Sequence, residues 1–328
     1  MNRRHTLQIA AYAARTSVRG GIGLVFLLLS LTFGLLVAHF MMQPIETMAR
    51  TLVDPARYET DEGRRDAELR MLEQLTERAK PVVVWMLSSP AADDAEEGDE
   101  PARETQRKRR RQIDPSDQDA EKWATYLLED RPGILSAIFL ILLLGWPFVV
   151  AFGAFDLYAG DIASRQLRYQ LLRADRSSIY FGRLLGLCIT LVAVLSLLGL
   201  VVTVYLGLKL GVYPWGEMLL WALQGTLMMV VVSLPFTALC GWISTAAGGS
   251  FTSLTLASLA IGGVPLVASL GSLQFESAQY VNWLLPWGFQ SRLLHHDPVQ
   301  QGLAIGGCLL QTAVFVWLGH RTFTRRDL

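Results

Sequence analysis

The residues best suited to chemistry are two adjacent histidines followed by an aspartate, His295, His296 and Asp297. Imidazole and carboxylate groups are ligands that a zinc ion accepts. Adjacent residues on a helix point about 100° apart, so two neighbouring histidines chelate one ion poorly there, although in a loop they could do so. We expect no metal ligand in this chain.

Other catalytic patterns are missing from the sequence. It has no H-E-x-x-H, and Gly248-Gly249-Ser250-Phe251 lacks the trailing glycine of a nucleophile elbow. No lysine follows a glycine, so there is no Walker A loop to hold the phosphates of ATP. We expect no catalytic residue and no directly bound cofactor, and a membrane enzyme is only the third hypothesis for function.

The composition is that of a polytopic membrane protein. Hydrophobic residues make up 52% of the 328 positions and charged residues only 18%, against about 25% charged residues in ordinary soluble domains. The 29 basic and 29 acidic residues balance, so no global charge attracts nucleic acid. Three cysteines exclude a disulfide-rich secreted scaffold.

Uncharged stretches predict six transmembrane helices, because about 20 mostly apolar residues cross a bilayer. The longest stretch, 218–275, holds two helices joined by a turn near Ile243–Ser250. An ion-coupled carrier is disfavoured because no ionisable residue lies near the centre of a predicted span. The predicted spans are 20–41, 134–156, 182–206, 217–240, 250–271 and 301–319.

Basic residues predict the orientation. If the N-terminus is cytoplasmic, the short inner segments carry many arginines, whereas the short outer loops carry only Lys209 and Arg292. We therefore expect a multi-pass protein of a bacterial inner (plasma) membrane with both termini cytoplasmic. Three units follow: residues 1–41 (amphipathic segment and first span), 42–133 (outer loop) and 134–328 (spans two to six).

The extracytoplasmic loop, 42–133, is predicted to be partly helical and partly disordered. Asp61–Lys80 has helical periodicity, and the apolar run Pro81–Leu87 reads as a short strand. Opposite charge blocks at Asp93–Glu100 and Arg107–Arg111 are typical of a solvated linker rather than a nucleic-acid site, because no aromatic residues interleave the basic block. Glu121–Asp130 is expected to lead helically into the second span.

The cytoplasmic segment between spans two and three, Phe155–Gly186, is the most informative part of the sequence. Leucines at helical spacing, surrounded by arginines, predict an amphipathic helix over about 160–176. Such a helix could rest on anionic membrane lipid or dock a cytoplasmic partner, and physical reasoning alone leaves both open. The candidate site residues are Asp161, Arg165, Leu167, Arg168, Leu171, Leu172 and Arg176.

This segment resembles the signature of type-2 ABC exporter permeases, a family that includes the gliding-motility and nitrous-oxide-reductase maturation permeases. The matching steps are Leu167-Arg168, Leu171-Leu172, Arg176-Ser177 and Gly182-Arg183, in that order. The C-terminal Phe323–Leu328 also resembles the family's ending. The sequence departs from the pattern at Arg165-Gln166, where Gly-Thr is usual, and at the proline step.

The resemblance implies a function. The predicted helix would be a coupling helix seated in a groove of a separate ABC ATPase subunit, with ATP bound by that partner and not by this chain. Two permease copies, as a homodimer or heterodimer, and two ATPases would form the transporter, which is expected to be an exporter. The competing hypothesis is a membrane scaffold or receptor whose outer loop, 42–133, binds an extracytoplasmic protein.

Overall fold

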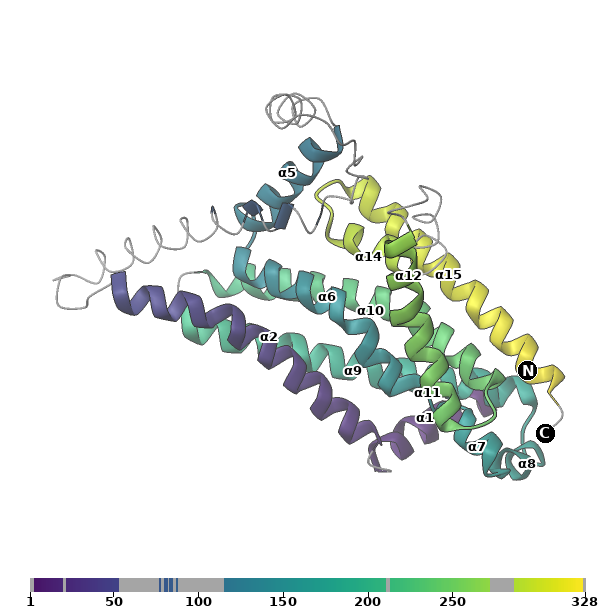
Figure 1. The fold of residues 1–328 in the computed structure, drawn as a ribbon. Helices are drawn as coiled ribbons and strands as arrows, with labels where there is room; N and C mark the ends of the chain where they lie inside the picture. The colour runs from purple at the N-terminus through teal and green to yellow at the C-terminus, as the bar shows by residue number, and fades with distance from the viewer. Residues whose placement is uncertain are drawn as a thin grey trace.

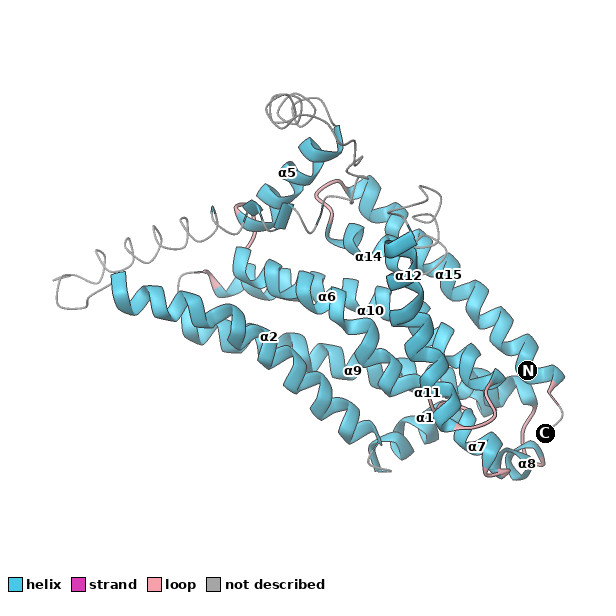
Figure 2. Cartoon of the chain, viewed as in Figure 1, coloured by secondary structure: helices cyan, strands magenta, loops and turns pink. Residues whose placement is uncertain are grey.

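The computed structural model describes residues 3–19, 22–52, 115–210, 213–271 and 286–326, together with single positions at 77, 80, 81, 83, 84 and 87. Within these residues every regular element is a helix (Figures 1 and 2). The charge blocks at Asp93–Glu100 and Arg107–Arg111 lie outside the described residues, as does nearly all of the predicted helix at 61–80.

Six helical segments in the described part of the chain are long and apolar enough to cross a membrane, as the sequence predicts. These six helices indicate a multi-pass membrane protein. These segments are α2 (Ile22–Leu52), α6 (Gly133–Ala154), α9 (Arg176–Leu210), α10 (Trp215–Ala246), the run from α11 (Ser250–Ser258) to α12 (Val264–Gly271), and α15 (Pro298–Arg325).

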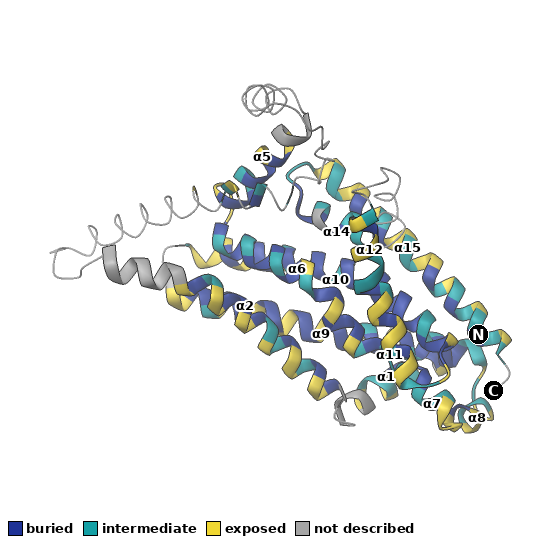
Figure 3. Ribbon diagram, viewed as in Figure 1, coloured by how far each residue is buried: buried dark blue, intermediate teal, exposed yellow. Residues whose placement is uncertain are grey.

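The helices α6 and α10 form the centre of the bundle. Trp146 on α6 is fully buried and donates its indole N–H to Ser233 on α10 over 2.8 Å. Exposed side chains concentrate on α2, α11 and α15, and those along the spans are largely leucine and valine (Figure 3). An apolar outer surface of this kind is compatible with lipid, which offers no hydrogen bonds.

The fifth span is interrupted by one π-helical turn, Leu259–Gly263, between α11 and α12. The N–H of Val264 bonds to the carbonyl of Leu259, five residues earlier. Pro265 follows directly and has no N–H to donate, so the regular ladder cannot continue through it. A proline in a predicted span thus appears as a local widening of the helix.

Short helices occupy the two ends of the bundle. At one end lie α5 (Pro115–Leu128), α14 (Trp287–Gln290), the 3-10 helix η4 (Ser291–Leu294) and the start of α15 (Figure 1). At the other lie α7 (Ala159–Ala163), α8 (Gln166–Leu171) and the end of α15, with α1 (Arg3–Arg19) packed along α9.

The prediction of a strand at Pro81–Leu87 is wrong. Its described residues are helical, and Val83 is buried against Ala124, Leu128 and Leu140. The apolar positions 83, 84 and 87 suit a helix that rests on α5, and this tertiary packing outweighs the strand preference of a β-branched run. The helix expected at Glu121–Asp130 is present as part of α5, but a turn separates it from α6.

Candidate partner-docking surface

The connection between α6 and α9 differs from the single helix predicted over 160–176. It consists of two short helices, α7 and α8, that meet at Arg165, whose φ of 59° and ψ of 13° are left-handed. A non-glycine residue costs about 1–2 kcal/mol in that conformation. The chain therefore turns where a continuous helix was expected, and Arg176 is the first residue of α9.

Arg183 on α9 holds both short helices in place. Its guanidinium forms an ion pair with Asp161 on α7 and donates to Oε1 of Gln170 on α8 over 3.0 Å. It also donates to the carbonyl of Leu157, at 3.0 Å, in the turn that follows α6. One side chain thus joins three consecutive parts of the connection, which fits the several fixed donors of a guanidinium.

The start of α7 is tied to the end of α10. The hydroxyl of Ser244 accepts hydrogen bonds from the backbone N–H groups of Tyr158 and Ala159, at 2.9 and 3.0 Å. These N–H groups belong to a helix N-terminus and have no partner within their own helix. Ser250 at the start of α11 adds a third tie, because its hydroxyl donates to Asp156 over 2.6 Å.

A small apolar core lies beneath α8. Leu167 is only 1% exposed and packs in a cluster with Tyr158, Tyr180 and Phe323. The rings of Tyr158 and Tyr180 stack with their centroids 5.3 Å apart, and the Tyr158 hydroxyl donates to the backbone carbonyl of Tyr180 over 2.7 Å. Burial of Leu167 therefore fixes which face of α8 points outward.

Arginine side chains donate hydrogen bonds to the carbonyls at the ends of α15 and α10. Arg176 donates to the carbonyls of Thr324 and Arg326, at 2.7 and 3.0 Å. Arg326 in turn donates to the carbonyls of Thr245 and Ala247 at the end of α10. The last carbonyls of a helix lack intrahelical donors, so these contacts satisfy them and lock the helix ends together.

The outward face, which we call the α8 surface, combines positive charge with apolar area. Tyr169 and Leu172 are 75% and 83% exposed. Asp175 is exposed beside them. The α8 surface consists of Arg165, Arg168, Tyr169, Leu172 and Arg173, all of them exposed.

The predicted site residues thus fall into two groups. Arg165, Arg168 and Leu172 lie on the α8 surface, whereas Asp161 and Arg176 make internal contacts. The expected apolar stripe is divided, because Leu167 is buried in this chain's own core and Leu171 is half-buried beside it. The sequence prediction placed Arg173 among the arginines around the leucine stripe but not among the site residues, and it left out Tyr169. Helical position relative to the buried Leu167 would have been the signal for both.

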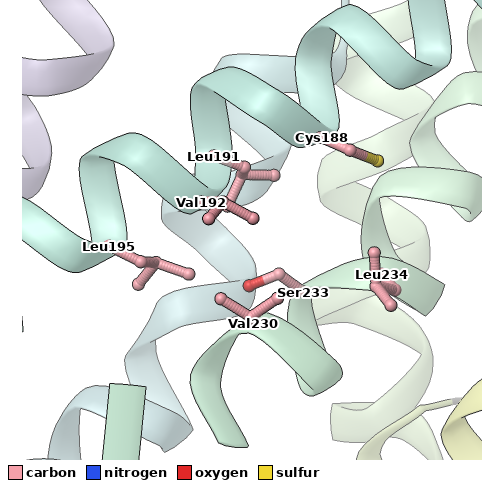
Figure 4. Close-up of a pocket in the computed structure, with 7 residues that line it drawn as sticks. All are labelled: Cys188, Leu191, Val192, Leu195, Val230, Ser233 and Leu234. Carbon is pink, nitrogen blue, oxygen red and sulfur yellow. The ribbon is translucent and has the colours of Figure 1, made fainter. Parts of the chain in front are cut away.

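A hollow between α9 and α10 offers no comparable site. Figure 4 shows its lining, which is aliphatic apart from Cys188 and Ser233. The Ser233 hydroxyl is already bonded to Trp146 and to the carbonyl of Met229. The hollow has room for about one water-sized molecule, so it is too small to hold a substrate.

No protein-family model and no curated protein matches this sequence. The function therefore has to be inferred from the residues and their arrangement.

Proposed function

We propose that this chain is the membrane-spanning permease subunit of an ATP-driven ABC transporter, acting as an exporter with a separate ATPase subunit docked on the α8 surface. The observation that carries the proposal is an exposed, positively charged and partly apolar surface on a rigidly held connection between two spanning helices. A second copy of the chain would complete the membrane part, and the termini would be cytoplasmic.

The charge of the α8 surface supports a protein partner with an acidic rim. Along this exposed segment Arg165, Arg168 and Arg173 flank Tyr169 and Leu172 in sequence. Protein interfaces commonly place an apolar or aromatic anchor at the centre and charged groups at the rim, where they steer association. The partner would supply the ATP site, because this chain has no Walker A loop.

The ties beneath the α8 surface support a coupling role. Arg183 joins α7 and α8 to α9, Ser244 joins α7 to α10, and Arg176 joins the start of α9 to the end of α15. A force applied to α8 would therefore be shared by several spanning helices and move them as one body. Rigid-body rotation of packed subunits is an established way to switch between two conformations.

The test is co-purification of the ATPase with variants of the tagged full-length chain from its native membrane in a mild detergent. We expect Leu172→Glu and Arg168→Glu each to reduce recovery of a P-loop ATPase at least about tenfold. Both side chains are exposed, so neither change should disturb the bundle. Arg325→Glu is the matched control, because Arg325 is an exposed arginine at the same end of the bundle, outside the α8 surface.

Full ATPase recovery with both α8-surface variants would contradict the proposal, as would a wild-type preparation that yields no ATPase. Recovery of an outer-compartment protein through residues 42–133, with no ATPase, would instead favour a membrane scaffold.

A further inference from the structure

A cluster of metal-ligand residues lies at the end of the bundle opposite the α8 surface. Asp119 comes from α5, while His295 and His296 lie in the loop between η4 and α15. Both histidines are outside any helix, so the 100° separation of neighbouring helical residues does not apply to them. The loop lets the two imidazoles stack, with ring centroids 4.5 Å apart, and both face the same carboxylate.

The spacing of the ligand atoms is close to that of a coordination shell. Nε2 of His295 lies 3.1 Å from Oδ2 of Asp119, and Nε2 of His296 lies 3.8 Å from Oδ1. One ligand atom from each residue falls within 4.8 Å of the other two. Zinc–ligand bonds of about 2.0–2.2 Å put neighbouring tetrahedral ligands roughly 3.3 Å apart, so a modest closing of the pair of histidines would bring all three to one ion.

One polar atom in the cluster has no assigned role. Nδ1 of His296 is buried and has no hydrogen-bond partner within the described part of the chain. A buried polar atom without a partner is costly and calls for an explanation. Turning this ring to bring Nε2 onto an ion would therefore break no hydrogen bond between Nδ1 and the described residues.

Residues around the cluster are held by hydrogen bonds and ring contacts. Trp123 on α5 donates its indole N–H to the carbonyl of Leu294 over 2.8 Å, and its ring lies 4.6 Å from that of His295. Asp297, which the sequence grouped with the histidines, is the N-cap of α15 and accepts from the N–H of Val299. The distant Asp119, and not the adjacent Asp297, therefore lies beside the two histidines.

We propose that Asp119, His295 and His296 bind a divalent transition-metal ion of the zinc class, with a water molecule in the fourth position. Two imidazoles and one carboxylate suit zinc, whereas magnesium and calcium favour oxygen ligands. The ion would join α5, which belongs to the segment between spans one and two, to the start of the sixth span. The proposed role is a metal-dependent staple at this end of the molecule.

Binding requires a local change at His295. Its Nδ1 accepts the N–H of Asp297 over 3.0 Å, so in the metal-free state the ring proton sits on Nε2 and points to Asp119. Coordination through Nε2 moves that proton to Nδ1 and breaks the bond to Asp297. We expect binding to be accompanied by a rearrangement of 295–297 and to be weaker than at a closed four-ligand site.

The test is calorimetric titration of zinc chloride into the full-length protein in detergent, with any affinity tag removed. Wild-type protein should bind one zinc ion per chain, and magnesium chloride should give no binding heat. Asp119→Asn and His296→Ala should each weaken zinc binding at least about tenfold. Asp297→Asn is the matched control, because asparagine caps a helix as well as aspartate and the residue is not a proposed ligand.

The absence of zinc binding to the wild type would overturn the proposal, as would undiminished affinity in both ligand variants. Wild-type protein titrated with cobalt(II) tests it without any substitution. Intense visible absorption bands that zinc displaces would support a four-coordinate nitrogen–oxygen site, whereas the weak spectrum of hydrated cobalt would contradict it.

Discussion

At the scale of single residues, arginines organise the end of the bundle that carries α7 and α8. Arg176 and Arg326 each donate to backbone carbonyls at the end of another helix, and Arg183 joins Asp161 to the turn after α6. Helix ends leave carbonyls without intrahelical donors, and these arginines supply the missing donors. These arginines therefore contribute to folding as well as to surface charge.

We predict that Arg183→Gln destabilises the protein by about 2 kcal/mol. The side chains of Arg183 and Asp161 are 14% and 27% exposed. Removing Arg183 leaves the carboxylate of Asp161 unpaired but still partly hydrated, so the loss of stability is smaller than for a fully buried charge. The measurement is the thermal unfolding of the variant in detergent. Arg168→Gln, which removes an exposed arginine of the α8 surface, is the control, and equal unfolding temperatures for the two variants would contradict the role of Arg183.

At the scale of elements, the packing of α1 on α9 depends on two glycines one turn apart. A Cβ atom at Gly182 would lie 3.1 Å from the carbonyl oxygen of Thr6, and one at Gly186 would lie 2.9 Å from that of Ala10. The G-x-x-x-G spacing lets two helix backbones approach closely. The second G-x-x-x-G pair, Gly302 and Gly306 on α15, has no atom within 4 Å of the added Cβ positions.

Gly186→Ala is therefore expected to loosen α1 from α9 and to destabilise their contact by about 1–3 kcal/mol. The added methyl group meets backbone atoms that cannot rotate away. The rate of trypsin cleavage within α1 should rise, because detachment exposes its backbone. Gly306→Ala is the matched control with open space around it, and a cleavage rate that rises equally in both variants would count against close packing at Gly186.

At the scale of the whole molecule, α8 and the ends of α1 and α15 lie opposite α5 and α14 (Figure 1). The α8 surface and the proposed metal site are thus separated by the length of the spanning bundle. Combined with the arginine-rich character of the α8 end, this arrangement predicts that the α8 surface faces the cytoplasm and that the metal site faces the outer compartment.

Single-cysteine labelling in intact cells tests that orientation. The starting protein is a variant in which Cys188, Cys240 and Cys308 are replaced. A membrane-impermeant maleimide should label Glu217→Cys, at the start of α10, without permeabilisation. It should label Tyr169→Cys, on the α8 surface, only after the membrane is opened. Both native residues are exposed, so accessibility within the protein does not limit either reaction. The reverse labelling pattern would show that the orientation is inverted.

How far the structure could be predicted differs between the spans and the candidate sites. The turn between spans four and five, expected near Ile243–Ser250, is present after Ala246 because paired glycines interrupt an apolar run. The helix over 160–176 was predicted from leucine spacing, but the break at Arg165 carries no glycine or proline signal. The two short helices on either side of the break are held by side chains outside them: Arg183 donates to Gln170 of α8, and Ser244 accepts from the backbone N–H of Tyr158 just before α7.

The sequence by itself determined the number of spanning helices, and the physical reason is that this signal is local. A helix in lipid satisfies its own backbone hydrogen bonds, so length and hydropathy within one segment are sufficient. The absence of a Walker A loop is likewise a local property of the sequence.

Only the tertiary structure decided which side chains share a surface. Leu167 is buried and Leu172 exposed because Tyr158, Tyr180 and Phe323, from three different helical regions, form the core beneath α8. Asp119 joins His295 across 176 positions of sequence, while the nearer Asp297 is used as a helix cap. Contacts of this kind depend on how whole helices pack, and no local periodicity encodes that packing.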